Sequence, residues 1–189
     1  MNNYSHKYFR ESLNQYRANG AESLRGELPK LLEATESPNA TKSFLHFVAD
    51  VCIDLKDYDQ SIHLLKSVES KFQLSDVGYN ILAFCYWELN QEREAYSAYK
   101  QSLSLKADNF SSLRGACFLA IETDHDTEAV EFCRSLTLAL PQDREFVIWF
   151  ATALWNADMT VELKEFVHSR EQEFGVDDEL REFINSGAK

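Results

Sequence analysis

Two small groups of residues have the side-chain types that catalysis or metal binding requires. Cys117 and His125 are the types used as a thiol nucleophile and its general base. Asp124, His125 and Asp126 offer two carboxylates and an imidazole, which are metal-binding groups. Both groups also have ordinary explanations, because Cys117 falls at a small packing position of a repeat and residues 124–126 fall in a short polar turn. We therefore expect structural roles for both.

The histidines give no stronger indication of chemistry. No two are four residues apart, as two zinc ligands on one helix would be, and the chain has no HExxH motif. It also lacks a glycine-rich phosphate loop, a GxSxG motif and an EF-hand pattern. The sequence therefore predicts a protein that is not an enzyme and that binds no metal or cofactor. The histidines are His6, His46, His63, His125 and His168.

The composition is that of an acidic, helical protein. Hydrophobic residues make up 44% of the 189 residues, which is ordinary for a chain with a packed core. Only 6 Gly and 3 Pro interrupt it, which favours helices over the many turns of an all-β fold. The 19 Lys and Arg and the 31 Asp and Glu give a net charge of 19 − 31 = −12. This charge repels phosphates, so we expect neither nucleic acid nor an anionic membrane as a partner.

The amino-terminal residues and the cysteines favour a cytoplasmic location. The opening sequence MNNYSHKYFRESLNQY lacks the apolar run of a signal peptide. No segment approaches the roughly 20 apolar residues of a membrane span. The cysteines form no CxxC pair, which argues against a zinc or thioredoxin-like site. In the cytoplasm all 4 would stay reduced: Cys52, Cys85, Cys117 and Cys133.

A repeat with a period of 34 residues organises most of the chain. The stretches that align without gaps are SFLHFVADVCIDLKDYDQSIHLL (43–65), VGYNILAFCYWELNQEREAYSAY (77–99), SSLRGACFLAIETDHDTEAVEFC (111–133) and EFVIWFATALWNADMTVELKEFV (145–167). Apolar columns at spacings of three and four residues predict a first helix in each unit. That helix is centred on a column of small residues, namely Ala49, Ala83, Cys117 and Ala151.

A second helix follows in each unit. Its apolar column lies sixteen residues after the small column and consists of Leu65, Tyr99, Cys133 and Val167. The short polar segments LKDY, LNQE, TDHD and ADMT separate the two helices. Each unit is thus predicted to be an antiparallel pair of helices.

This pattern resembles the tetratricopeptide repeat, whose signature is W-x2-L-G-x2-Y…A-x3-F…P over 34 residues. The unit at residues 76–109 carries, in order, Tyr79, Leu82, Ala83, Tyr86, Ala95 and Tyr99. The last unit departs most, with Leu163 where a small residue is usual. The resemblance implies an all-α fold, a right-handed superhelix (α-solenoid) of about four to five antiparallel helix pairs.

We expect a single domain over residues 1–189. Residues 5–36 predict a further helix pair off the strict register, with Pro29 in the first turn of its second helix. Residues 176–186 predict a short capping helix, which solenoids need at their ends. The repeats themselves are predicted at residues 42–75, 76–109, 110–143 and 144–174.

The resemblance also implies where a partner would bind. In this family the first helix of each unit lines a concave groove that holds peptides or protein segments. The matching positions here combine an apolar, partly aromatic floor with an acidic side. They are His46, Asp50, Ile53, Asp54, Asn80, Phe84, Trp87, Glu88, Arg114, Phe118, Ile121, Glu122, Ile148, Thr152 and Trp155.

These positions predict the chemistry of the partner. A segment with apolar anchors and Lys or Arg would fit them. The cationic clamp by which some relatives hold a terminal carboxylate is not expected, because only Asn80 and Arg114 have suitable side chains. The opposing interpretation is that Phe84 and Phe118 contact the adjacent helix and the acids are only solvated.

The leading functional prediction is a non-catalytic protein-interaction module or adaptor. One alternative is a dedicated cytoplasmic chaperone or antagonist of a secreted protein, which a small acidic array of this repeat also resembles. Another is a self-associating structural scaffold that uses Trp149, Trp155 or the terminal helices.

Overall fold

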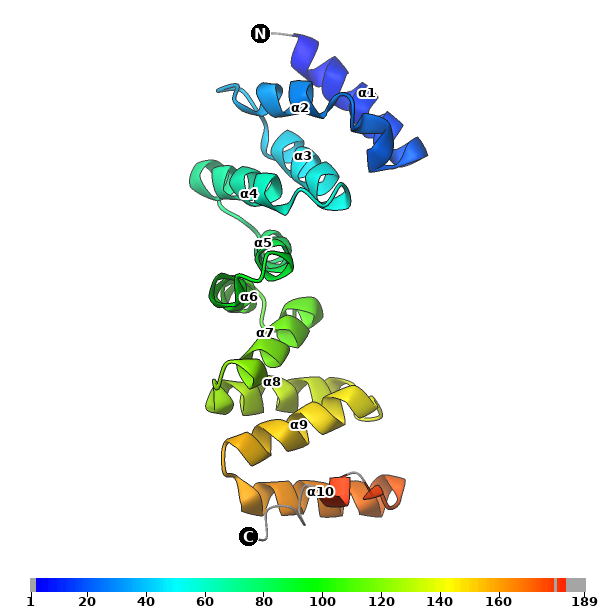
Figure 1. The fold of residues 1–189 in the computed structure, drawn as a ribbon, viewed down its shortest axis with the longest axis vertical. Helices are drawn as coiled ribbons and strands as arrows, with labels where there is room; N and C mark the ends of the chain where they lie inside the picture. Colours follow the sequence, from blue (N-terminus) through cyan, green and yellow to red (C-terminus); the bar gives the residue numbers. More distant parts are fainter. Residues whose placement is uncertain (1–2, 179, 183–189) are drawn as a thin grey trace. The chain divides into compact units, whose positions relative to one another are not determined.

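The computed structural model describes residues 3–178 and 180–182, and the regular structure in this part of the chain is helical throughout (Figure 1). The helices pack mainly against their neighbours in sequence, as in a helical solenoid. The all-α fold class predicted from the sequence is confirmed. In chain order the elements are α1 (Asn3–Asn19), η1 (Ala21–Leu24), α2 (Leu28–Thr35), α3 (Lys42–Asp54), α4 (Tyr58–Phe72), α5 (Asp76–Glu88), α6 (Glu92–Leu105), α7 (Phe110–Glu122), α8 (Asp126–Ala139), α9 (Arg144–Asn156) and α10 (Thr160–Phe174).

The chain divides into two compact units, Met1–Leu105 and Lys106–Lys189, which are described separately below. In the first unit α3 packs against α4, α4 against α5, and α5 against α6. In the second unit α7 packs against α8, and α9 packs against α7, α8 and α10. The pairs α3/α4, α5/α6, α7/α8 and α9/α10 each fall within one 34-residue repeat.

The first helix of each pair begins at a capping residue, and the caps themselves are 34 residues apart. In each cap a side-chain oxygen accepts a hydrogen bond from a backbone N–H in the first turn, at 3.0–3.3 Å. A cap of this kind typically contributes about 1 kcal/mol to helix stability. The capping residues are Thr41, Ser75, Asn109 and Asp143.

The turn inside each pair repeats as closely as the caps. One residue of each turn has a left-handed backbone with φ between 56° and 62°. The N–H of the following residue donates to the carbonyl five residues earlier at 2.8–2.9 Å, which closes the first helix in a Schellman motif. Asn and Asp adopt this conformation more readily than most residues with a Cβ. The left-handed residues are Lys56, Asn90, Asp124 and Asp158.

The core of each pair is built from the predicted columns. The small column Ala49, Ala83, Cys117 and Ala151 has no exposed surface. The opposing column on the second helix, Leu65, Tyr99, Cys133 and Val167, is 0–6% exposed. The two helices of each pair therefore meet where the small side chains allow a close approach.

The ends of the chain differ from the repeats. The amino-terminal segment forms α1, η1 and α2, and Pro29 lies in the first turn of α2 as predicted. Gly175, with φ of 91°, ends α10. Residues 178, 180, 181 and 182 are helical and Leu180 is 1% exposed, whereas residues 179 and 183–186 of the predicted capping helix lie outside the described residues.

Candidate functional site

The predicted groove residues lie on α3, α5, α7 and α9, the first helices of the pairs. None of them is buried, since every one keeps intermediate or full exposure. They fall into two sets, one in each compact unit. The structure therefore leaves these side chains accessible, and their role in binding stays a prediction.

In the first unit, two carboxylates sit one helical turn apart on α3. Asp50 and Asp54 are four residues apart and so lie on one face of the helix. Burial, and then the neighbouring charge of Asp54, raise the pKa of the Asp50 carboxyl to about 6. Among the described residues, no Lys, Arg or His forms an ion pair with either carboxylate. The Asp50 carboxylate is thus partly desolvated, and in the described part of the chain no cation pairs with it.

A tyrosine from the amino-terminal helix fixes one of these carboxylates. The Tyr16 hydroxyl donates to Asp54 Oδ2 at 2.7 Å, and the Tyr16 ring packs edge-on against Phe47 with centroids 5.7 Å apart. Burial and this hydrogen bond raise the pKa of Tyr16 to about 12. Tyr16 is absent from the predicted set because α1 does not follow the 34-residue register.

A second tyrosine lies beside the aromatic part of the same face. The ring of Tyr58, at the start of α4, meets Phe84 of α5 edge-on, with centroids 6.0 Å apart. Desolvation, and then interaction with the Glu88 carboxylate, raise the pKa of Tyr58. Trp87, on the next turn of α5, is 43% exposed. The first unit therefore presents acids held by tyrosines next to accessible aromatic rings.

His46 does not add positive charge to this face at neutral pH. Burial and the nearby Lys42 ammonium lower the pKa of the His46 imidazole. The Lys42 ammonium itself donates to the carbonyl of Gln73 at 2.9 Å.

The predicted groove residues of the second unit have different surroundings. Arg114 Nη2 lies 3.1 Å from Glu145 Oε2, so the basic side chain predicted for the groove is already paired. The ring of Phe118 lies 5.9 Å from that of Trp149 on α9, and the Thr152 hydroxyl donates to the carbonyl of Ile148. This face is mainly apolar, with its cation neutralised.

The structure agrees in part with the alternative interpretation, in which Phe84 and Phe118 contact adjacent helices. Each ring does contact an aromatic ring on an adjacent helix, Tyr58 and Trp149 respectively. Both phenylalanines nevertheless remain partly exposed. Packing and accessibility therefore coexist at these two positions.

The residues first considered for chemistry lie apart from one another. Cys117 is buried and joined to Cys133 on α8 by a disulfide, so it is not a nucleophile for His125. His125 lies in the turn before α8, with Nδ1 2.9 Å from Thr123 Oγ1. Across residues 3–178 and 180–182, no group of three or more His, Cys, Asp or Glu side chains is arranged to hold a metal ion.

The expectation that all cysteines stay reduced is wrong for Cys117 and Cys133. The repeat register contains a signal for their bond, because the small column and the column sixteen residues later are buried on the two helices of every pair. Only in the pair at residues 110–143 are both positions cysteine. The bond is not predicted because a cytoplasmic location implies that cysteines stay reduced. Cys52 and Cys85 are free and buried, in agreement with the expectation.

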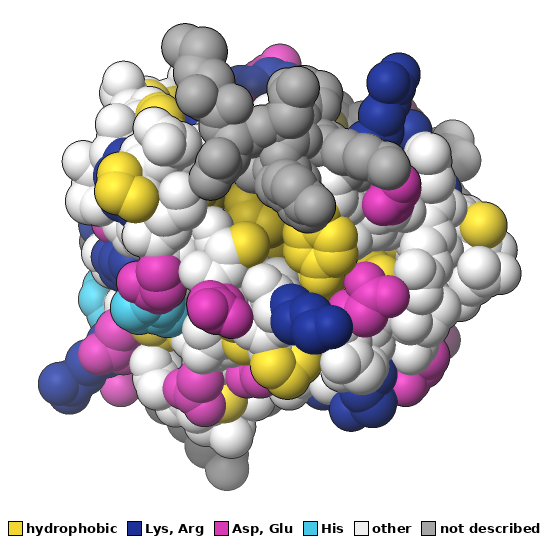
Figure 2. All heavy atoms as spheres, turned by 90° about the horizontal axis from the view of Figure 1, so that it is seen from above, with side chains coloured by type: hydrophobic (Ala, Val, Ile, Leu, Met, Phe, Trp, Pro, Cys, Tyr) yellow, Lys and Arg dark blue, Asp and Glu magenta, His cyan; other side chains and the backbone are white. Residues whose placement is uncertain are grey.

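The surface carries charges of both signs. In the view of Figure 2, Asp and Glu side chains are interspersed with Lys and Arg, and hydrophobic side chains appear between them. No helix in the described part of the chain is long and apolar enough to cross a membrane.

Comparisons with known proteins agree with the geometry. The sequence profile of the tetratricopeptide repeat matches residues 78–109. A search of curated protein sequences gives no match. The fold is similar to a crystal structure of MamA (TM-score 0.70, 11% identity, covering 90% of this chain and 96% of that one).

Two further solved structures have a similar fold. One is YrrB, described as a tetratricopeptide-repeat protein with an unusual peptide-binding site (TM-score 0.64, 12% identity, covering 94% and 96%). The other is Naa15/Naa10 bound to HypK-THB (TM-score 0.67, 17% identity, covering 89% of this chain and 25% of that one). At these identities the likeness concerns the fold alone. The chain therefore carries a tetratricopeptide repeat at residues 78–109, within helix pairs whose fold is similar to that of these solved structures.

Proposed function

We propose that this protein is a non-catalytic interaction module that holds a peptide or protein segment on the inner faces of its first helices. Tetratricopeptide repeats form extended surfaces of this kind. Of two proteins with a similar fold, YrrB has an unusual peptide-binding site and Naa15/Naa10 is bound to HypK-THB. These similarities support the class of function, and the partner chemistry is inferred from the side chains of this chain.

The observation that carries the proposal is the acid pair on α3. Asp50 is half-buried beside Asp54, and burial raises the pKa of its carboxyl to about 6. At neutral pH the carboxyl is therefore ionised, although desolvation makes its charged form less favourable than it would be in water. No described side chain supplies a cation to offset this cost. A ligand with Lys or Arg would supply one, and Phe84 and Trp87 lie one repeat further along as contacts for apolar anchors.

A selection from a random peptide library tests this proposal. We expect enrichment of segments that combine Lys or Arg with aromatic or aliphatic residues. The dissociation constant of a selected peptide should then rise at least tenfold for Asp50→Asn combined with Asp54→Asn, and binding should weaken with added salt. Asp59→Asn, an exposed acid on α4, is the matched control. Equal binding by both variants and by Phe84→Ala would place the ligand elsewhere on the protein.

The narrower functions stay predictions from the sequence. A dedicated cytoplasmic chaperone of a secreted protein would bind its client through the same surface. A self-associating scaffold would instead show a mass in solution that increases with protein concentration, with no change on mutating the acid pair.

A further inference from the structure

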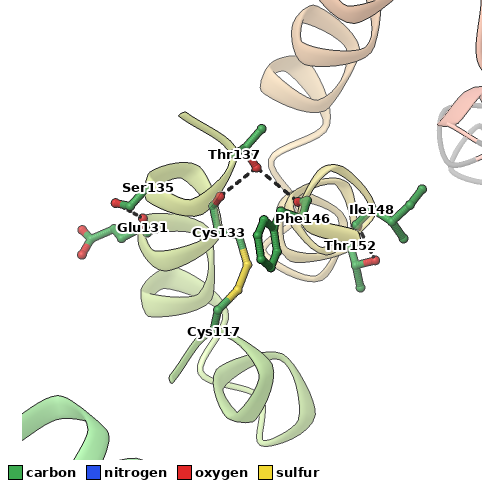
Figure 3. Close-up of a disulfide and its surroundings, with 8 residues drawn as sticks. All are labelled: Cys117, Glu131, Cys133, Ser135, Thr137, Phe146, Ile148 and Thr152. Carbon is green, nitrogen blue, oxygen red and sulfur yellow. Dashed lines mark hydrogen bonds between the residues drawn. A yellow bond between two sulfur atoms is a disulfide. The ribbon is translucent and has the colours of Figure 1, made fainter. Parts of the chain in front are cut away.

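The disulfide in the second unit joins the two helices of a single repeat. Cys117 on α7 and Cys133 on α8 are bonded, with their Cα atoms 5.8 Å apart (Figure 3). Neither residue has exposed surface. The bond closes a loop with a sequence separation of 16 residues. It therefore links elements that already pack together, and its effect falls on that one pair.

The same two positions are filled differently in the other pairs. There a buried alanine of the small column is followed sixteen residues later, on the second helix, by a larger buried residue: Leu65 after Ala49, Tyr99 after Ala83, and Val167 after Ala151. In the α7/α8 pair two small side chains meet instead. With the bond broken, this pair would lack the larger apolar side chain that closes each of the others.

The remaining packing of α7 also bears on how much this helix depends on the bond. Gly115 lies in the interior of α7, where glycine disfavours a helix relative to alanine. The buried apolar side chains of the pair include small ones, such as Ala116 and Ala129, and larger ones, such as Leu119 and Leu136. The disulfide therefore adds a covalent link to a pair that is also held by apolar packing.

The far side of α8 has an attachment of its own. Thr137 Oγ1 lies 2.8 Å from the carbonyl oxygen of Cys133 and 3.2 Å from that of Phe146 at the start of α9 (Figure 3). This hydroxyl ties α8 to α9 whether or not the disulfide is present. α7 is likewise attached to α9, through the Arg114–Glu145 ion pair and the Phe118–Trp149 ring contact. Loosening caused by reduction should therefore be largest where α7 and α8 meet.

We propose that the Cys117–Cys133 pair is a redox-controlled lock on α7. When the bond is formed, α7 is held against α8. When it is reduced, α7 opens and closes more often. This property does not depend on the proposed function, although Phe118, the residue after Cys117, belongs to the predicted groove.

Lock formation is a two-electron exchange with a small-molecule disulfide such as glutathione disulfide. One cysteine thiolate attacks a sulfur of the oxidant and releases one thiol, and the second cysteine attacks the resulting mixed disulfide and releases another. The two cysteine protons end on the two released thiols. A dithiol reductant reverses the exchange. Because both sulfurs are buried, either direction requires the pair to open first.

The free cysteines serve as an internal comparison. Burial raises the pKa of Cys52 to about 12 and raises that of Cys85. These thiols therefore stay protonated and react slowly, so changes in redox buffer should act on Cys117 and Cys133 alone.

Hydrogen exchange of the ligand-free protein tests the lock. The protein is equilibrated with glutathione disulfide or with a dithiol, and the bond is mapped by mass spectrometry after alkylation. We expect amides of α7 to exchange on the order of 100-fold faster after reduction, from the entropy of a loop of this length, with faster exchange also in α8 where it meets α7 and no change in α3 to α6.

A redox-inert variant provides the control. Cys117→Ala with Cys133→Val reproduces the Ala151 and Val167 packing of the last pair. It should show no redox dependence, and its α7 exchange should lie between those of the two wild-type states. Thiols that stay free in glutathione disulfide, or identical α7 exchange in the oxidised and reduced protein, would overturn the proposal. Because no ligand is used, neither result bears on the groove.

Discussion

The two compact units carry the same helix pairs but use them differently. In the first, the predicted groove residues include carboxylates that no described cation offsets, and its cysteines are free. In the second, Arg114 is paired with Glu145, the rings of Phe118 and Trp149 pack on each other, and a disulfide joins two helices. The same repeat geometry therefore carries carboxylates without a described counter-ion in one unit, and charged and aromatic side chains that pair with one another in the other unit.

The largest expected difference between the units concerns their cysteines. Reduction of Cys117–Cys133 should lower the free energy of unfolding of the second unit by about 3 kcal/mol, because the unfolded chain gains loop entropy. Cys52→Ser, a change in the first unit, leaves the disulfide in place and should keep the full dependence on dithiol. Urea unfolding with and without a dithiol measures both. An equal effect of dithiol on Cys117→Ala with Cys133→Val would contradict the assignment.

The next largest effect concerns the aromatic contacts. Phe84→Ala should weaken a selected peptide by about 2 kcal/mol, since a central aromatic anchor is typically worth this much at an interface. Phe72→Ala removes an exposed phenylalanine, 43% accessible, at the end of α4 and is the matched control. Titration calorimetry measures both variants. Equal losses would mean that the ring acts only through folding.

A smaller effect, of opposite sign on stability and binding, is expected at Asp50. Its folded-state pKa of about 6 exceeds the ordinary value of 3.8, so the folded state is favoured by protonation and loses stability as the pH rises from 4 through 6. Asp50→Asn should therefore stabilise the protein by about 1–2 kcal/mol above pH 7 and by nothing at pH 4.

The same substitution should weaken binding of a basic peptide at neutral pH. For the wild type, affinity should also fall as the pH drops below 6, because Asp50 loses its charge. Thermal unfolding and binding measured across this pH range decide the matter. A variant less stable than wild type at neutral pH would show that the carboxylate contributes a contact that outweighs its desolvation.

The smallest effect is expected at Arg114. Its ion pair with Glu145 is about half exposed on both sides, so Arg114→Ala should cost less than about 1 kcal/mol of stability. Because the guanidinium is already paired, a peptide with an amidated carboxyl terminus should bind as well as the free acid. A strong preference for the free acid would reveal a carboxylate clamp after all.

A cytoplasmic location remains a prediction from the sequence, and the disulfide gives it a direct test. Disulfides are rare in reducing compartments. Alkylation of thiols in intact cells should find Cys117 and Cys133 blocked if the protein matures where an oxidant is present. Four reactive thiols after unfolding would favour the cytoplasm.

The repeats could be predicted from the sequence because their constraints recur. Ala49 and its equivalents sit where two helices touch, and only small residues fit there, so the period is visible in the sequence. The side chains that complete the site are less predictable. Tyr16 donates to Asp54 from α1, which does not follow the 34-residue register, and the ring of Tyr58 contacts Phe84 of the next repeat. These contacts depend on tertiary packing, and the columns of the repeat do not predict them.

The recurrence of the caps has a consequence for how such a chain can change in length. Ser75 and Asn109 cap the first helices of successive repeats with the same kind of hydrogen bond. A second copy of residues 76–109 placed after Asn109 would therefore have a capping residue before it and another at its end. Insertion of one residue more or fewer would misplace the cap, the left-handed turn residue and the buried alanine together. Duplication of a whole 34-residue repeat is therefore the change in length that this protein should tolerate best. Growth by gene duplication would then add one complete repeat at a time.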